Sequence, residues 1–381
     1  MPTPLLVLLG ALLATYASQM LLAAIGFARI RSQPVPEAPR SWPAVSVVVP
    51  ARNEADGIDA CLDSLRAVDY PSDRLEIIVV DDFSTDGTAE RVRARQPAGR
   101  VEPADDPVRL VEMAATEDTN GGHKPAALAR GVRAADGDVI LTTDADCAVP
   151  PAWIKSMVRR CTTETPFVAG PVEYEHGERF LPRLQALELT GLVAYGAGTI
   201  GVGLPTFCNS ANVAYRRDAI APRASAPDGA ARDEMLLQHV AYGTDRQVAF
   251  NPDPEARVMT EPPETLPDYL QQQARWAHMG LRYPFALPRA LVVGLWAAHA
   301  ALFLVCAAAL ALPAWREPAL LLLLGKMAAD AVLTVPAARH FGQRGLLRST
   351  VPTELLLLVA VPLIGVLGTF GALEWKGRSL D

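Results

Sequence analysis

Four long apolar runs limit what this chain can fold into, because each is long enough to cross a lipid bilayer. The first covers residues 5–27 without a charge, and a membrane-spanning helix needs about 20 such residues. Three more close the chain, at residues 290–311, 319–336 and 355–372. An apolar content of 50% and a mean hydropathy of +0.16 agree with membrane segments. We therefore predict a multi-pass membrane protein with one N-terminal and three C-terminal spans.

Arginines beside these runs predict how the chain is oriented. Arg29 and Arg31 follow the first run, whereas a cleaved signal peptide would carry its positive residues before a shorter apolar core. Three more arginines separate the last two runs, namely Arg339, Arg344 and Arg348. Short loops rich in Lys and Arg stay in the cytosol, so we expect the N-terminus on the outer side of the membrane. The expected location is the cell membrane (inner or plasma membrane). Residues of about 30–285 are then cytosolic.

The third run contains two ionisable residues, Lys326 and Asp330, four positions apart. This spacing places them on one helical face, where they can form an ion pair. Ionisable residues inside a span suggest a functional site. A pair that only ties helices together is an equally good interpretation.

Between the first two runs, apolar strands alternate with amphipathic helices. Residues 45–49 and 75–80 are short apolar runs typical of buried strands, and residues 138–146 repeat the pattern. This alternation predicts an α/β domain with a mostly parallel sheet covered on both faces. The expected segments are an anchor at 4–28, a proline-rich linker at 29–43, the α/β domain at 44–262, an interfacial segment at 263–286 and three spans at 287–375.

Polar residues follow the ends of three predicted strands. They are Arg52 to Glu54, then Asp81 and Asp82, then Asp144 and Asp146. Ligands of parallel sheets bind beyond the carboxyl ends of the strands. Mg²⁺ or Mn²⁺ is commonly held there by one or two carboxylates together with substrate phosphates. An Asp-x-Asp triplet alone could equally be a turn.

Several other classes of protein are disfavoured. Neither the glycine-rich dinucleotide fingerprint nor a P-loop is present. The net charge of −7 and the lack of a basic tract give no reason to expect a nucleic-acid partner. The five cysteines are scattered and never form a C-x-x-C pair, so we expect neither a disulfide framework nor a zinc site.

Four stretches in the middle region, taken in order, resemble the family 2 glycosyltransferases of the GT-A fold. They are VVVPARNEADGIDACLDSL, IIVVDDFSTDGT, GGHKPAALARG and ILTTDADCAVPPAWI. The resemblance implies an inverting enzyme that uses a nucleotide-diphosphate sugar, with a UDP-sugar as the expected donor. It assigns a nucleotide-sugar pocket to Ala51, Arg52, Glu54, Asp81, Asp82 and Lys124, and the metal and diphosphate motif to Asp144 and Asp146. Among the histidines, His123 is of interest because it stands next to Lys124.

Two later segments resemble membrane synthases such as the cellulose and hyaluronan synthases. PTFCNSANVAYRRDAI resembles their Phe-Cys-Gly-Ser segment near the acceptor, which here is Phe207, Cys208, Asn209 and Ser210, with Asn209 in place of glycine. QQQARW supplies a Q-x-x-R-W motif, Gln272, Arg275 and Trp276. An arginine can clamp phosphate oxygens and a tryptophan can stack on a sugar. The same residues also suit an amphipathic interfacial helix, and we expect both roles.

An inverting transfer needs a general base. The family pattern places it in ARDEMLLQHVAYG, on Asp233, with Glu234 as a shifted alternative. Arg232 stands where the family usually has an acid. The two acids could instead only stabilise a helix N-terminus.

The expected function is therefore a membrane-bound glycosyltransferase with a lipid-linked or membrane-proximal acceptor, similar in layout to ceramide glucosyltransferase. A processive polysaccharide synthase is an alternative within the same class. A non-catalytic, nucleotide-binding subunit of a synthase is an alternative from another class, encouraged by Arg232.

Overall fold

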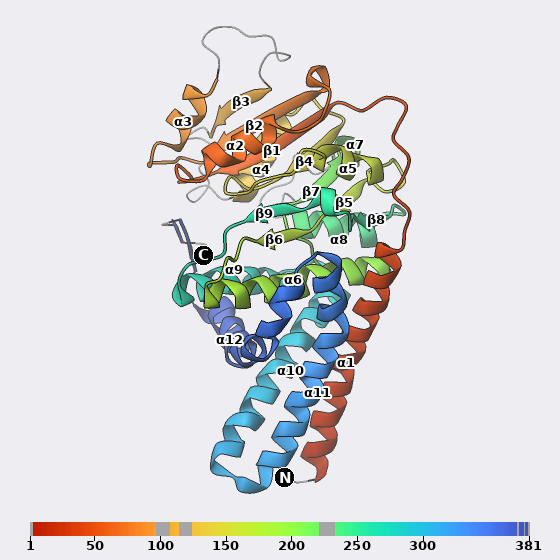
Figure 1. The fold of residues 1–381 in the computed structure, drawn as a ribbon, viewed down its shortest axis with the longest axis vertical. Helices are drawn as coiled ribbons and strands as arrows, with labels where there is room; N and C mark the ends of the chain where they lie inside the picture. Colours follow the sequence, from red (N-terminus) through yellow and green to blue (C-terminus); the bar gives the residue numbers. More distant parts are fainter. Residues whose placement is uncertain are drawn as a thin grey trace. The chain divides into compact units, whose positions relative to one another are not determined.

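The computed structural model describes residues 3–96, 107–113, 124–220, 233–371, 373–376 and 378–379 (Figure 1). The chain divides into two compact units. Residues 31–173 and 207–261 form one, here called the sheet unit. Residues 1–30, 174–206 and 262–381 form the other, the helical unit. Residues 174–206, which the sequence assigns to the α/β domain, therefore cluster with the apolar helices.

The described part of the sheet unit is built on a seven-stranded sheet in the order β3-β2-β1-β4-β7-β5-β8. Its strands are β1 (Val45–Ala51), β2 (Leu75–Asp81), β3 (Val108–Glu112), β4 (Val139–Thr142), β5 (Phe167–Ala169), β7 (Val213–Arg216) and β8 (Val248–Phe250). β1 to β4 pair in parallel, β5 pairs in parallel with β8, and β7 is antiparallel to both of its neighbours. The prediction of a mostly parallel sheet is confirmed.

The central strands are buried on both faces, as expected for parallel strands covered by helices. Val47 to Val49 and Ile77 to Val80 are fully buried. The helices of this unit are α2 (Ile58–Arg66), α3 (Thr88–Ala94), α4 (Lys124–Ala134), α5 (Trp153–Arg160), α7 (Arg217–Ile220) and α8 (Asp233–Gly243). A short two-stranded sheet pairs β6 (Val172–Tyr174) with β9 (Val258–Thr260). α2 buries one face, formed by Ile58, Cys61, Leu62 and Leu65, in agreement with the amphipathic helices expected between the strands.

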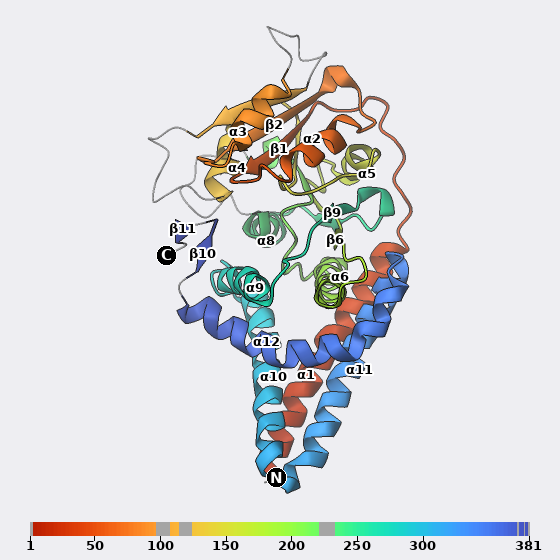
Figure 2. The same ribbon diagram turned by 60° about the vertical axis from the view of Figure 1, so that its left-hand side comes forward.

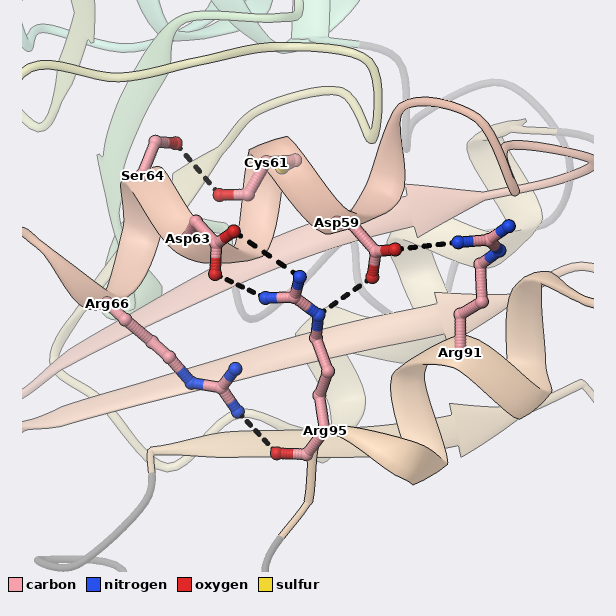
Figure 3. Close-up of polar contacts among 7 residues, drawn as sticks. All are labelled: Asp59, Cys61, Asp63, Ser64, Arg66, Arg91 and Arg95. Carbon is pink, nitrogen blue, oxygen red and sulfur yellow. Dashed lines mark hydrogen bonds and ion pairs between the residues drawn. The ribbon is translucent and has the colours of Figure 1, made fainter.

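Surface ion pairs join α2 to α3 (Figure 3). Asp59 pairs with Arg91 at 2.8 Å and with the Arg95 Nε at 2.7 Å. Arg95 also pairs with Asp63, and its carbonyl accepts a hydrogen bond of 2.7 Å from Arg66. Exposed pairs of this kind contribute little stability individually. As a network they fix α2, whose N-terminal end lies beside the Asp144–Asp146 turn.

The helical unit contains α1 (Thr3–Arg31), α6 (Phe180–Gly201), α9 (Leu266–Leu281), α10 (Ala286–Ala311), α11 (Arg316–His340) and α12 (Thr350–Phe370). One-turn helices at Pro313–Trp315 and Arg344–Ser349 connect the last three, and β10 (Glu374–Trp375) pairs with β11 (Arg378–Ser379) after them. Among the described residues, four helices are long and apolar enough to cross a membrane, at 4–31, 286–311, 313–340 and 344–370. One is N-terminal and three are C-terminal, as predicted.

α1 runs parallel to α11. At one end Phe27 packs against His340 and Phe341. At the other end Leu9 clusters with Ala319 of α11 and with the last turns of α10. Arg29, Arg31 and Arg339 are therefore carried by the same end of this bundle, in agreement with the charge pattern of the sequence.

Glycines let α1 and α6 approach closely. A Cβ on Gly26 would lie 1.9 Å from the carbonyl oxygen of Gly198, and a Cβ on Gly198 would lie 2.1 Å from that of Ala23. Small residues allow backbones to touch in this way where helices cross in a membrane. The crossing ties α6 to the N-terminal helix.

The ion pair predicted between Lys326 and Asp330 is present, with a distance of 2.8 Å. Two further groups complete the cluster. Glu354 of α12 contacts the same ammonium, and the Tyr16 hydroxyl of α1 donates to Asp330 at 2.5 Å. The cluster thus joins three helices. Tyr16 and Lys326 of the cluster also line a small cavity, together with His299.

Candidate functional site

The loops that follow β1 and β2 are joined by hydrogen bonds. The Arg52 guanidinium donates to the Asp82 carbonyl at 2.7 Å, and the Asn53 side chain accepts from the Thr85 amide at 2.9 Å. The Glu54 amide donates to Thr88 Oγ1 at 2.8 Å. These contacts bring Ala51, Arg52, Glu54, Asp81 and Asp82 together, as the sequence predicts for a pocket at the strand ends.

The backbone of both loops is strained. Asn53 and Phe83 have φ values of 50° and 54°, in the left-handed region that residues other than glycine rarely adopt. Such conformations persist only where the surroundings enforce them, and they are concentrated at functional sites. The strain therefore favours a functional role for the two loops at this edge of the sheet.

Asp81 offers a hydrogen-bond acceptor to a ligand. Its side chain is 5% exposed, and its Oδ2 accepts from the Ser84 amide at 3.2 Å. Its other oxygen, Oδ1, is buried and accepts no hydrogen bond from the described residues. A buried carboxylate oxygen without a donor is costly. This atom therefore suits a ligand that brings an N–H group.

Lys124, the first residue of α4, links two other predicted site residues. Its Nζ lies 2.6 Å from Asp144 Oδ1 and donates to Ser210 Oγ at 2.9 Å. Burial alone would lower the pKa of Lys124, but Asp144, and to a lesser extent Asp233 and Asp146, raise it above its usual value. The lysine is therefore held protonated among carboxylates.

Asp146 presents an exposed carboxylate in a fixed turn. The Cys147 amide donates to the Asp144 carbonyl at 3.1 Å, and Ala148 pairs with Met259 through two backbone bonds of 2.8 and 2.9 Å. Gly57, at the start of α2, fits closely against the turn, since a Cβ there would lie 3.2 Å from the Asp146 Cα. The predicted Asp-x-Asp pair is therefore both a turn and a presented acid.

The donor set here suits a divalent ion bound together with a ligand. Within the described ranges, no group of three or more His, Cys, Asp or Glu side chains could hold a metal ion alone. One or two carboxylates with substrate oxygens are the usual ligands of Mg²⁺. Asp146 and the half-buried Asp144 fit that arrangement, although Asp144 is also paired with Lys124.

Asp233, the first residue of α8, is almost completely buried, with 2% exposed. Its Oδ2 lies 3.5 Å from the Thr142 hydroxyl, which is 2.9 Å from the carbonyl of Ser210. Burial, and then the neighbouring Glu234, raise the pKa of Asp233 well above its usual range. A carboxyl group of this kind binds a proton more readily, as a general base must.

The segment Phe207 to Ser210 ends in a turn formed by residues 209–212. The Asn209 side chain accepts from the Ala211 amide at 3.0 Å, and its carbonyl accepts from the Asn212 amide at 3.1 Å. Asn209 does not have a positive φ, so asparagine can occupy this position without backbone strain. Burial raises the pKa of the Cys208 thiol, so it stays protonated and unreactive.

The Q-x-x-R-W residues lie on α9, in the helical unit. Gln272 accepts a hydrogen bond of 2.8 Å from the Tyr174 hydroxyl. Arg275 is half-buried, and burial lowers its pKa, while Trp276 is 39% exposed. Nearby, Tyr269 donates to Glu188 of α6 at 2.9 Å, and burial raises the pKa of Glu188 to about 7. α9 is thus anchored, with its arginine and tryptophan at the surface.

The structure therefore brings together Lys124, Asp144, Ser210 and Asp233. It adds Thr142, which the sequence alone does not single out because it reads as an ordinary β-branched residue of a strand. The one feature of the sequence that could have indicated Thr142 is its position two residues before Asp144. Arg232 and His123 lie outside the described residues.

The amino-acid sequence matches a known protein family in the region that carries most of these residues. Residues 46–221 match the family described as "Glycosyl transferase family 2", and they include β1, β2, β4 and the Asp144–Asp146 turn. Residues 46–221 form a family 2 glycosyltransferase domain. The match ends before Asp233, which therefore lies beyond the family 2 domain so defined.

Two curated relatives are similar to this chain in sequence. An "N-acetylglucosaminyltransferase" of Rhizobium meliloti is 31% identical over 293 residues, which are 73% of this chain and 65% of the relative. A "Beta-monoglucosyldiacylglycerol synthase" of Synechocystis is 32% identical over 133 residues, 34% of this chain and 24% of the relative. The chain thus spans less than two thirds of the length of these relatives.

A solved structure has the same fold. The mannosyltransferase PcManGT of Pyrobaculum calidifontis, in complex with GDP-Man and Mn²⁺, is 24% identical, with a TM-score of 0.58. The similarity covers 92% of this chain and 99% of that protein. It extends beyond the family 2 domain to most of the described helices.

Proposed function

We propose that this protein is a membrane-bound inverting glycosyltransferase. It moves a sugar from a nucleotide-diphosphate donor to a lipid-linked or membrane-proximal acceptor. The observation that carries the proposal is the cluster at the sheet edge. There, a buried acid with a raised pKa, Asp233, lies beside Thr142 and Ser210, and Lys124 connects Ser210 to the Asp-x-Asp turn.

The nucleotide would lie over the loops after β1 and β2. Asp81 Oδ1 would accept an N–H of the base, and Arg52, Asp82 and Glu54 would form the walls of the pocket. Uracil and guanine both carry an imino N–H, so this contact alone does not choose between them. The UDP-sugar implied by the sequence resemblance stays the expected donor.

Asp146, with Asp144, would hold Mg²⁺ or Mn²⁺ against the diphosphate. The Mn²⁺ of the archaeal mannosyltransferase supports this assignment. When bound, a divalent ion stabilises the negative charge that develops on a diphosphate leaving group. Lys124 would add a second positive charge at the same place. The sequence resemblance assigns phosphate and sugar contacts to Arg275 and Trp276 of α9, and the chemistry of both side chains suits those roles.

Asp233 would take the proton of the acceptor hydroxyl while that oxygen displaces the diphosphate, which inverts the anomeric carbon. Its buried position keeps water from the carboxylate and strengthens it as a base. Phe207 to Ser210 would line the acceptor side. Glu234, on the same turn, remains the alternative base, but its side chain is less buried than that of Asp233.

The four apolar helices, and a relative whose name includes a diacylglycerol lipid, favour a lipid acceptor. The arginines beside the apolar runs favour the cytosolic face of the cell membrane. The test is release of nucleoside diphosphate by the full chain in lipid nanodiscs. UDP- and GDP-sugars would be offered with and without extracted membrane lipid, and Asp233→Asn would serve as the matched inactive variant. We expect release from one donor, stimulated by lipid and lost in the variant. No release from any donor, or equal release by the variant, would contradict the proposal.

A further inference from the structure

α12 has the length and composition of a membrane span, but its contacts run across the bundle. Near its start, Glu354 meets Lys326, close to the middle of α11. Three turns later, Gly365 meets the indole of Trp296, close to the middle of α10. A Cβ on that glycine would lie 1.8 Å from the indole nitrogen. A helix aligned with α10 and α11 would instead follow each of them from end to end. Figure 2 shows α12 lying across α1, α10 and α11.

One face of α12 supports α9, the helix with the Q-x-x-R-W motif. Ala360 and Ile364 pack against Tyr269. Further along, the Gly368 carbonyl lies 2.7 Å from His278 Nδ1, and a Cβ on Gly368 would lie 2.8 Å from the Ala274 carbonyl oxygen. α9 and α12 therefore lie side by side along most of their lengths, with no room for lipid between them.

The opposite face of α12 is an exposed apolar stripe. Its residues recur every three or four positions and are Val351, Leu355, Val359, Leu363, Val366 and Phe370, each between 41% and 84% exposed. This spacing places them on one side of the helix. The single charged residue of α12, Glu354, is buried in its ion pair. A continuous apolar stripe of this size indicates contact with a membrane or a partner.

The occupant that fits this stripe is the acyl-chain region of the bilayer. The candidate spans α10 and α11, on which α12 packs, also expose leucines, among them Leu304, Leu310 and Leu321. Basic residues stand on both sides of α12 in the sequence, Arg344 and Arg348 before it and Lys376 and Arg378 after it. Since basic flanks favour the cytosolic side, both ends of α12 are expected on the same side.

We propose that α12 lies in the plane of the membrane beneath α9, with its apolar stripe in the acyl chains. Three helices, α1, α10 and α11, then cross the bilayer, and residues 344 and 376 lie on the same side. This inference does not depend on the proposed catalysis. In this arrangement α12 faces the acyl chains with one side and packs against α9 with the other. The membrane therefore supports the helix with the Q-x-x-R-W motif through α12.

Spin-label depth in nanodiscs tests the inference on the full chain. A ketone-bearing unnatural residue carries the label, so the five native cysteines are untouched. Leu355 and Val366 of α12 are eleven residues apart, as are Val293 and Leu304 of α10, the matched control pair. We expect the α12 pair to have nearly equal depth, and the α10 pair to differ by roughly 16 Å at 1.5 Å per residue. A depth difference in α12 like that of α10 would overturn the proposal.

A second measurement needs no purified protein. Ala314→Cys, Arg344→Cys and Lys376→Cys are each treated in intact cells with a membrane-impermeant maleimide, and labelling of the parent chain is subtracted. We expect Arg344→Cys and Lys376→Cys to behave alike and opposite to Ala314→Cys, in the turn after α10. If Lys376→Cys reacts like Ala314→Cys, α12 crosses the membrane and the inference is wrong.

Discussion

The Lys124 ammonium lies 2.6 Å from the Asp144 carboxylate and 2.9 Å from the Ser210 hydroxyl. One side chain thus connects the Asp-x-Asp turn after β4 with the segment before β7 that we propose to lie on the acceptor side. Because Lys124 also lowers the pKa of Asp233, it influences the proposed base without touching it. The proposed metal site, acceptor side and general base therefore all depend on the position of the Lys124 ammonium.

Replacement of Lys124 by methionine should therefore have two effects. Turnover should fall by about tenfold or more, since one charge-assisted contact contributes roughly 1.5–3 kcal/mol. The acid limb of the pH–rate profile should also move to higher pH, because removal of the cation raises the pKa of Asp233 further. Steady-state rates over a range of pH on both sides of neutrality check both. Lys124→Arg keeps the charge, and it should leave the acid limb in place; an unshifted limb in Lys124→Met would show that the lysine does not act on the base.

Asp233→Asn tests the proposed base directly. The amide keeps the shape of the side chain but cannot accept a proton, so turnover should fall by about 10²- to 10⁴-fold. Binding of the nucleoside diphosphate should be unchanged, since that pocket lies on the loops after β1 and β2. Calorimetric titration and turnover separate the two quantities. Glu234→Gln is the control, and a larger loss there than in Asp233→Asn would move the base to Glu234.

The same residue predicts how stability depends on pH. The folded-state pKa of Asp233 is raised above its unfolded value, so the folded protein binds the proton more tightly. Stability contributed by this group is therefore present at low pH and is lost as pH rises from the unfolded pKa, about 4, through the folded one. Asp233→Asn should remove that decline. Thermal midpoints of both proteins, measured from about pH 4 upward, check it; parallel curves would contradict the buried, proton-binding state.

Sequence reasoning found the sheet and its acid-tipped edge because both depend on local patterns. The buried runs of β1 and β2 are continuous in the chain, and polar residues after parallel strands must meet at one edge. The apolar face of α2 followed from helical periodicity in the same way. The family resemblance then assigned roles that spacing alone left open.

Other features depend on tertiary contacts that no local pattern encodes. Thr142 reads as a strand residue, and only the fold brings its hydroxyl beside Asp233 and Ser210. Glu354, the third charge of the Lys326 cluster, comes from a different helix, so i, i+4 spacing could not reveal it. Hydropathy measures how apolar α12 is and not its direction, so the sequence could not suggest the orientation that we propose for this helix.

The proposed metal site predicts a dependence on divalent ions. Chelation by EDTA should abolish turnover, and Mn²⁺ or Mg²⁺ should restore it. Asp146→Asn removes the exposed carboxylate, so it should raise the metal concentration needed for half-maximal rate by about tenfold or more. A tenfold change corresponds to a loss of about 1.4 kcal/mol of binding free energy. Asp63→Asn is the matched control, an acid on the surface of α2 whose ion pair with Arg95 lies in the network of Figure 3. Equal metal dependence in the two variants would argue against Asp146 as a ligand.

The crossing of α1 and α6 predicts a stability effect far from the chemistry. Gly198→Ala puts a methyl group 2.1 Å from the Ala23 carbonyl oxygen, so the two backbones must separate. Overpacking of this kind costs about 1–3 kcal/mol, and the thermal midpoint in detergent should fall by several degrees. Gly10→Ala, on the partner helix α1, meets nothing within 4 Å and should leave the midpoint unchanged or raise it slightly, because alanine favours the helix. Since α6 also carries Glu188, which anchors α9 through Tyr269, Gly198→Ala should in addition reduce turnover more than nucleotide affinity. An unaltered midpoint in Gly198→Ala would mean that α1 and α6 do not touch at these glycines.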